Sequence, residues 1–312
     1  MSGINGFKIY AAPLQGYTEA LWRCRHYEIF GGVDCYFTPF MRVEKGGVRQ
    51  KDIRDLSTRL NTGVPVIPQA IFSCVDELRS ITDVVRQCGY DRLDLNLGCP
   101  FPPQWRKGRG AGMICRLDEM SNVAEFVRSN TDICFSVKMR LGVEQPDEYR
   151  ALLPVLNGMP LEHIAVHPRV ARQQYSGELA MDEFGRLLEK SAWPVIFNGE
   201  IRSVEDIDRI RENYPSLAGV MVGRGLLARP SLATEWRIGS LWTQDKLLGS
   251  ILLLHDGIYA ACRSSLCGDS QILSKIKPFW DYPASLIDRR VWKAIHKANS
   301  IRYYEAAVAM LR

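Results

Sequence analysis

The chain has 312 residues, 46% of them hydrophobic and 24% charged, with a formal net charge of +5. This composition is that of an ordinary globular protein. No apolar run approaches the roughly 20 residues of a membrane-spanning helix, and the N-terminus lacks the basic and apolar stretches of a signal peptide, so we expect no membrane partner.

The nine cysteines are an odd number, scattered along the chain without any C-x-x-C pair. In a chain without a secretion signal, such cysteines are interpreted as reduced thiols and not as disulfides or zinc ligands. We therefore expect a cytoplasmic protein without a bound metal.

Eight short segments are apolar and rich in β-forming residues, and a helix-compatible stretch follows each. Several are almost continuously apolar, as is typical of parallel strands that are buried on both faces. The expected strands are Phe7–Pro13, Asp34–Phe40, Val64–Ala70, Arg92–Asn96, Cys134–Met139, His163–His167, Pro194–Asn198 and Gly219–Gly223.

Helical patterns occupy the intervals, for example at residues 75–89, 117–130 and 203–214. Ser203 is a suitable cap for the last of these, and Asp118 and Glu119 suit the positive first turn of the second. Eight alternations of strand and helix predict an α/β fold, a (β/α)8 TIM barrel, over residues 1–235. A doubly wound open sheet is the alternative.

After Arg229-Pro230 the alternation stops, and residues 236–312 predict a small all-α domain. Residues 1–235 hold 29 basic and 29 acidic side chains, whereas residues 236–312 hold 11 and 6, so the excess charge lies in the second domain. A basic domain on a neutral body indicates a polyanionic partner. The alternative is a solvated helix face.

Polar residues stand at the carboxyl ends of the expected strands, where a TIM barrel forms its active site. Glycines after the seventh and eighth strands, with Arg224, suit a phosphate site, since backbone N–H groups can approach an anion there. Plain turns would also explain these glycines. The strand-end residues are Gln15, Gln69, Asn96, Cys99, Lys138, Arg140, His167, Arg169, Asn198, Gly199, Glu200, Gly223 and Arg224.

Three of these side chains indicate chemistry. Lys138 interrupts an apolar strand, which is costly unless an anionic or electron-rich group lies beside it. Gln69 has an amide that could face a ligand or satisfy a backbone group. Cys99 lies in a tight turn between Gly98 and Pro100. A thiol with a pKa of about 8.5 is mostly protonated at neutral pH and can act as an acid. A structural role is the alternative for each.

Taken together, the motifs resemble the tRNA-dihydrouridine synthase family, in the family's order and over nearly the whole chain. The combination of N-x-G-C-P with K-x-R-x-G is more specific than either alone. The matching segments are Ala11–Glu19, Asp94–Pro100, Gly108–Gly112, Ser136–Gly142, His167–Gly177, Phe197–Ile201 and Val222–Gly225.

The resemblance implies bound FMN that is reduced by NADPH and passes a hydride to C6 of uracil, while Cys99 protonates C5. It implies that Asn96 and Arg140 hold the base, which must leave the stacked RNA. The residues implied for FMN are Pro13, Leu14, Gln15, Gln69, Lys138, His167, Asn198, Gly199, Glu200, Gly223 and Arg224.

The C type of the family, which modifies U16 of the tRNA D-loop, resembles this chain most. The similar segments are Thr38–Val43 and Ser274–Trp280, which imply RNA contacts by Arg42, Lys275 and Lys277. The segment His167-Pro-Arg-Val170 replaces the family's usual H-G-R-T, and Gln104-Trp105 interrupts the usual stretch after the cysteine.

Two other functions fit parts of the sequence. An FMN-dependent barrel oxidoreductase acting on a small molecule would share the phosphate site without needing a basic helical domain. A tRNA-binding protein without catalysis would need no Cys99, Lys138, His167 and Arg224 set. We expect a tRNA-reducing enzyme that acts as a monomer.

Overall fold

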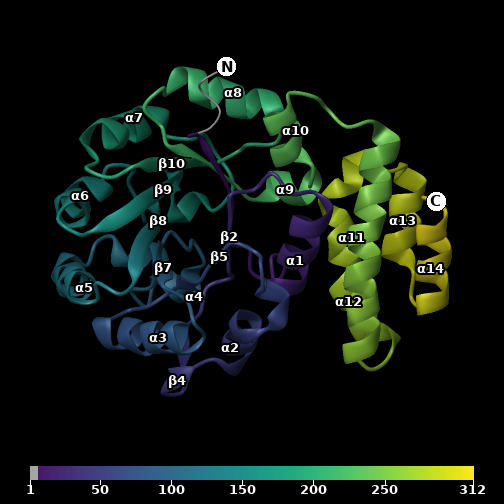
Figure 1. Ribbon diagram of the computed structural model, residues 1–312, viewed down its shortest axis with the longest axis horizontal. Helices are drawn as coiled ribbons and strands as arrows, with labels where there is room; N and C mark the ends of the chain where they lie inside the picture. Colours follow the sequence, from purple (N-terminus) through teal and green to yellow (C-terminus); the bar gives the residue numbers. More distant parts are fainter. Residues whose placement is uncertain (1–5) are drawn as a thin grey trace.

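A ring of parallel strands forms the larger part of the molecule, and a cluster of helices stands beside it (Figure 1). The computed structural model describes residues 6–312; residues 1–5, which begin the N-terminal segment on which the signal-peptide prediction rests, lie outside the described part. The strands of the ring are β1 (Lys8–Ala11), β2 (Cys35–Phe37), β5 (Val66–Ile67), β6 (Gln69–Ala70), β7 (Arg92–Leu97), β8 (Cys134–Gly142), β9 (Leu161–Val170), β10 (Val195–Asn198) and β11 (Gly219–Val222).

The third strand of the ring is divided by Pro68. Its first half, β5, pairs with β2, and its second half, β6, pairs with β7, so the hydrogen-bonded order runs around the ring and returns to the same strand. Proline has no N–H to donate, which explains the break, while its carbonyl accepts the N–H of Asp94 at 2.8 Å. The predicted eight-stranded barrel is confirmed.

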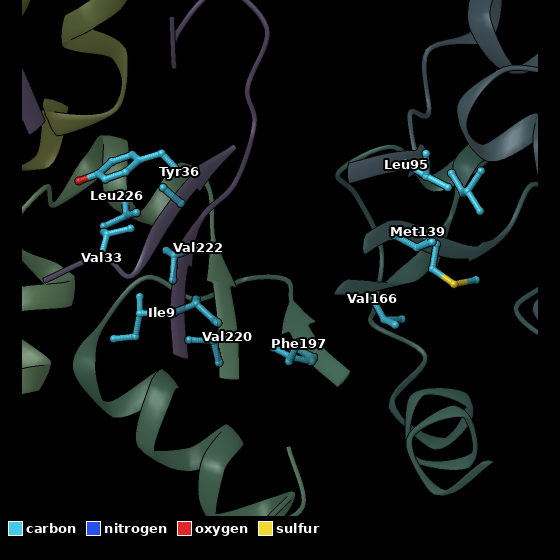
Figure 2. Packing of buried hydrophobic residues seen from close by; sticks show 14 of the residues in the cluster. Ile9, Val33, Tyr36, Leu95, Met139, Val166, Phe197, Val220, Val222 and Leu226 are labelled. Carbon is cyan, nitrogen blue, oxygen red and sulfur yellow. The ribbon is translucent and has the colours of Figure 1, made fainter. Parts of the chain in front are cut away.

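Alternate residues of each strand face the helices or the barrel interior, as the two-residue period of a strand requires. The residues facing the helices are apolar, and Figure 2 shows Leu95, Met139 and Val166 on three neighbouring strands. Tyr10 and Phe37 belong to a separate apolar cluster inside the ring. On β7, β8 and β9 most interior positions are polar, Ala165 being an exception, so polar side chains gather on one side of the barrel interior.

Helices cover the outside of the ring and follow the strands as predicted. Ser203 caps α8 by accepting the N–H of Asp206, and Asp118 and Glu119 lie in the first turn of α5. An antiparallel hairpin of β3 (Val43–Glu44) and β4 (Gly47–Val48) was not predicted. The helices are α1 (Ala20–Ile29), α2 (Gln50–Ser57), α3 (Val75–Gln87), α4 (Pro102–Trp105), α5 (Leu117–Ser129), α6 (Tyr149–Asn157), α7 (Met181–Lys190), α8 (Val204–Asn213), α9 (Arg224–Ala228) and α10 (Leu232–Ile238).

The C-terminal region is helical throughout, as predicted, and α11 packs against α1 of the barrel (Figure 1). The ring of Phe30 stacks on Trp242 with centroids 5.8 Å apart, which fixes the start of this region on the barrel. Helix α10 spans residues 235 and 236, where the sequence places the domain boundary. The helices are α11 (Gln244–Ser265), α12 (Asp269–Ile276), α13 (Arg289–Lys297) and α14 (Ile301–Ala309), with short 3-10 turns at Lys277–Asp281 and Pro283–Leu286.

Candidate active site

A cavity of about 660 Å³ opens at the carboxyl ends of the strands, a size typical of a cofactor or small-molecule site. All the predicted site residues except Arg169, Lys275 and Lys277 line it. They are Pro13, Leu14, Gln15, Arg42, Gln69, Asn96, Cys99, Lys138, Arg140, His167, Asn198, Gly199, Glu200, Gly223 and Arg224.

A chain of hydrogen bonds connects a buried carboxylate to the loop that carries Cys99. Asp94 accepts the amide N–H of Gln69 at 2.7 Å, and the carbonyl of Gln69 accepts the amide N–H of Asn96 at 2.7 Å. Asn96 Oδ1 then accepts the backbone N–H groups of Gly98 and Cys99, at 3.1 and 2.9 Å. A carboxylate only accepts, so Asp94 fixes the direction of every bond in the chain.

The Asp94 carboxyl is fully buried, and burial raises its pKa to about 6. Hydrogen bonds from Gln69 and from the Ser136 hydroxyl, at 2.7 Å each, act in the opposite direction. The charge of Lys138 also favours the ionised form. Asp94 was not among the predicted site residues, although it alternates with Arg92 and Asn96 on one face of the strand, a pattern that could have indicated it.

Cys99 is held where its thiol stays protonated. Burial raises the pKa of the Cys99 thiol, and Arg140 and Lys138 only partly oppose this. Gly110, in the short 3-10 helix Gly110–Met113, packs closely against the loop. A Cβ on Gly110 would lie 2.7 Å from the Cβ of Cys99. The backbone φ of Gly110 is +56°, a conformation that favours glycine. The thiol can therefore serve as an acid and not as a thiolate.

Lys138 and His167 face the cavity from adjacent strands. Burial, together with the neighbouring guanidinium of Arg140, lowers the pKa of Lys138 to about 8. Burial also lowers the pKa of His167 well below its usual value, with four nearby cations adding to the effect. His167 Nε2 lies 3.3 Å from Nη1 of Arg169. Arginine only donates, so Nε2 accepts and Nδ1 carries the proton of a neutral ring.

Arg140 is almost fully buried and ties three segments together. Its guanidinium donates to the backbone carbonyls of Gly98 at 3.1 Å, Val170 at 2.9 Å and Gln174 at 2.5 Å. It also lies over the ring of Tyr175, 5.7 Å from the centroid. These contacts join the Cys99 loop to the loop after β9, so the structure gives Arg140 a supporting role beside its place in the cavity wall.

Three arginines converge on one carboxylate at the ends of β10 and β11. Glu200 accepts hydrogen bonds from Arg169 and Arg224 at 2.8 Å each and from Arg202 at 2.7 Å. Glu200 has a positive φ of 46°. The local charge is positive, so the cluster can hold an anion, with the arginines as its ligands and Glu200 as the group that aligns them.

Two neighbouring contacts complete this end of the cavity. Asn198 donates to the carbonyl of Met221 at 2.7 Å and thereby joins β10 to β11. Arg224 lies over the face of Tyr175, 4.6 Å from the ring centroid. Arg202 and Tyr175 are cavity residues that were not predicted individually.

The helical region contributes directly to the cavity wall through Tyr282. Its ring meets Tyr17 of the first barrel loop edge to face, with centroids 5.1 Å apart, and both residues line the cavity. Burial raises the pKa of Tyr282 to about 12, so its hydroxyl remains neutral. Neither tyrosine was predicted, because no local pattern shows that residue 282 lies beside residue 17.

The two predicted lysines of the helical region do not reach the cavity. Lys275 donates to Glu19 at 2.9 Å, and Lys51 of α2 donates to the other oxygen of the same carboxylate at 2.7 Å. Lys277 donates to the backbone carbonyls of His296, at 3.0 Å, and of Ala298. Lys275 therefore joins the helical region to the barrel, and Lys277 closes the end of α13.

The first loop and Arg42 have modest contacts of their own. The backbone N–H of Leu14 donates to the Thr18 hydroxyl at 2.8 Å, and the amide of Gln15 donates to the carbonyl of Phe40 at 3.2 Å. Arg42 lies 3.5 Å from Glu44 in a partly exposed ion pair.

Within residues 6–312, no group of three His, Cys, Asp or Glu side chains could hold a metal ion. No described helix is long and apolar enough to cross a membrane.

The chain matches a known protein family over most of its length. The family described as "Dihydrouridine synthase (Dus)" matches residues 10–246. The chain is 33% identical over 178 residues to tRNA-dihydrouridine(47) synthase [NAD(P)(+)]-like from Xenopus laevis, covering 56% of this chain and 26% of that protein. It is 29% identical over 236 residues to tRNA-dihydrouridine(16) synthase from Pseudomonas syringae pv. tomato, covering 73% of this chain and 74% of that protein.

Solved structures show the same fold at low identity. Morphinone reductase superposes with a TM-score of 0.52 and 12% identity, over 76% of this chain and 87% of its own. The chain spans about a quarter of the Xenopus relative, whereas it spans most of the Pseudomonas one. Because the family match covers most of the chain, the protein belongs to the dihydrouridine synthase family.

Proposed function

From this family membership and the geometry of the cavity, we propose that the protein is an FMN-dependent tRNA-dihydrouridine synthase that uses NADPH and acts as a monomer. The substrate is a uridine of the tRNA D-loop, U16, whose C5–C6 double bond is reduced. One observation carries the proposal: a thiol kept protonated by burial shares a cavity with a buried lysine and a cationic anion site.

The cavity residues fit FMN. Arg224, aligned by Glu200, would supply a cation for a phosphate, and Arg169, which binds the same Glu200, would add positive charge nearby, while the glycines at 199 and 223 would leave room for backbone contacts. Lys138 supplies a positive charge for the electron-rich edge of the ring. The residues proposed to hold the cofactor are Pro13, Leu14, Gln15, Gln69, Lys138, His167, Asn198, Gly199, Glu200, Gly223 and Arg224.

FMN held by these residues would supply the hydride chemistry, with NADPH as the reductant and C6 of the uracil as the acceptor. The chain provides the remaining proton: Cys99, neutral because it is buried, donates it to C5 of the base. Asn96 fixes the Cys99 loop through two backbone N–H groups. Arg140 supports the same loop from the neighbouring strand β8 and, with Asn96, forms the wall against which the base lies.

The target position rests on the likeness to the C type. Relatives named for positions 16 and 20a/20b match at the same 29% identity, so overall identity does not choose between them. Arg42, which lines the cavity mouth, is proposed to contact the RNA. Lys275 and Lys277 serve tRNA binding by holding the helical region in place, since their amines are already engaged within the protein.

An anaerobic absorption experiment tests the function. The purified protein should show flavin bands that bleach with NADPH and return when unmodified tRNA is added. Bleaching without recovery on any tRNA would indicate a small-molecule oxidoreductase. A colourless protein that cannot be reconstituted with FMN, yet binds tRNA, would indicate a binding protein. Mapping dihydrouridine by mass spectrometry on tRNA with and without the U16→C change tests the position.

A further inference from the structure

The single-turn helix α4 begins three residues after Cys99 and separates the cavity from a second hollow. Phe101 and Gln104 line the cavity side. Trp105, Arg106 and Lys107 line an open surface hollow of about 630 Å³ on the other side. We call residues 101–107, together with Arg116, the α4 ledge.

The charges of the ledge are uncompensated. Among the described residues, Arg106, Lys107 and Arg116 take part in no ion pair, although the nearby Arg109 pairs with Glu77. Arg106 and Lys107 are exposed. Three cations without acidic partners around one hollow form a local positive field that attracts an anion.

The backbone is shaped to hold this arrangement. A Cβ on Gly108 would lie 2.7 Å from Nη1 of Arg116, and the φ of Gly108 is +71°. Position 108 therefore favours glycine. The absence of a side chain there lets Arg116 lie along the hollow, and Arg116 donates to the carbonyl of Ser73. Arg116 is therefore positioned by the fold and is not simply a mobile surface side chain.

An exposed aromatic ring stands on the cavity side of the ledge. Phe101 is 58% exposed, which is unusual for a large apolar side chain beside a deep cavity. Pro102 and Pro103, in the first turn of α4, restrict the backbone that carries it. A ring held in this way at the cavity mouth offers a flat apolar surface on which a base can stack.

We propose that the α4 ledge binds the RNA strand next to the target uridine, with Phe101 stacking on an adjoining base and the hollow holding backbone phosphates. This rests on the proposed function. A helix is about 10 Å across, which an RNA strand crosses in about three nucleotides. The ledge lies on the barrel, apart from α11–α14 (Figure 1), so the tRNA is gripped on both sides of the cavity.

Salt-dependent tRNA binding by the FMN-loaded protein tests the proposal. Arg106→Ala/Lys107→Ala should weaken binding and reduce the slope of log Kd against log salt by about 1 to 2, because each lost phosphate contact contributes about 0.7–0.9. Phe101→Ala should weaken binding about 5- to 100-fold without changing that slope. Phe101→Leu keeps an apolar side chain but cannot stack, so it should weaken tRNA binding about as much as Phe101→Ala does.

The control is Arg128→Ala/Lys190→Ala, which removes the same charge from the helix ends at the opposite face of the barrel. It should bind as the wild type does. The proposal is overturned if Arg106→Ala/Lys107→Ala keeps the wild-type slope of log Kd against log salt. It is also overturned if the control variant loses as much tRNA affinity as the ledge variant. If the wild-type protein itself neither binds nor reduces tRNA, the proposed function fails first, and the two failures are thus distinguished.

Discussion

Replacing Asp94 by Asn tests how the site is built, because this carboxylate sets the direction of the hydrogen bonds that hold the Cys99 loop. An Asn side chain can present its NH2 group to Gln69, which then turns its amide and leaves two NH2 groups facing each other at Asn96. An unsatisfied buried donor costs about 1–3 kcal/mol. If this cost falls on the step that needs the Cys99 proton, the rate of that step decreases about 5- to 150-fold.

Rapid mixing separates the two half-reactions of the variant. Reduction of the flavin by NADPH should stay within about twofold of the wild-type rate, whereas reoxidation by tRNA should slow by the factor above. Ser136→Ala is the matched control, since it removes a hydrogen bond to the other oxygen of the same carboxylate without changing the direction of the chain. Equal slowing of both half-reactions, or equal effects of the two variants, would refute the reasoning.

The Asp94 carboxyl group also predicts that the rate of tRNA-dependent reoxidation decreases at low pH. The pKa of Asp94 is raised to about 6, so the group is ionised above that pH and protonated below it. A protonated carboxyl can donate, and Gln69 is then no longer held in one orientation. The rate of tRNA-dependent reoxidation should therefore decrease as the pH falls through about 6 in the wild type, and Asp94→Asn should lack this inflection. Folding stability has the opposite sign: the raised pKa favours the folded state at low pH, and that contribution is lost as the pH rises through about 6.

Further outcomes are expected in the same assay. Cys99→Ala should keep FMN and its reduction by NADPH but slow tRNA-dependent reoxidation about 10²–10⁴-fold; a wild-type rate would remove Cys99 from its role. Gly110→Ala, whose Cβ would lie 2.7 Å from Cys99, should slow reoxidation more than Gly89→Ala, where φ is also positive but no atom lies within 4 Å; similar rates would show that backbone strain alone matters. Because the pKa of Lys138 is lowered to about 8, its cation is lost above that pH and reoxidation should decrease there, while Lys138→Arg should move this limb to higher pH. An unchanged limb in that variant would assign it to another group.

The barrel was predictable because its strands are apolar on the helix-facing side and begin or end at polar residues. β8 and β9 extend beyond their predicted ends, since Arg140 and Arg169 interrupt the apolar pattern while still occupying interior positions. The hairpin at Val43–Val48 was missed because its turn, Lys45-Gly46, carries a positive φ at both residues, whereas a lysine gives no turn signal.

The site was predictable as a set of residues but not as a set of contacts. Strand-end positions correctly brought Gln69, Cys99 and Arg224 to one cavity. The contacts depend on tertiary packing. Gln69 donates to Asp94, and Lys275 donates to Glu19, which is 256 positions away along the chain. Local sequence does not show which acid a lysine will meet, so the resemblance of Ser274–Trp280 to the C type implied an RNA contact for Lys275 without indicating its partner Glu19.

The division of the third strand by Pro68 has a consequence for how the molecule is assembled. Its neighbours on the two sides, β2 and β7, are the ring strands that precede and follow it along the chain, and the ring is continuous only when both have joined the five residues Val66–Ala70. Gln69 lies in that seam and at the same time in the cavity wall. The pairing of this strand with both neighbours and the completion of the cavity wall at Gln69 are therefore coupled, and uptake of the flavin by a refolding chain should report when the third strand is joined on both sides.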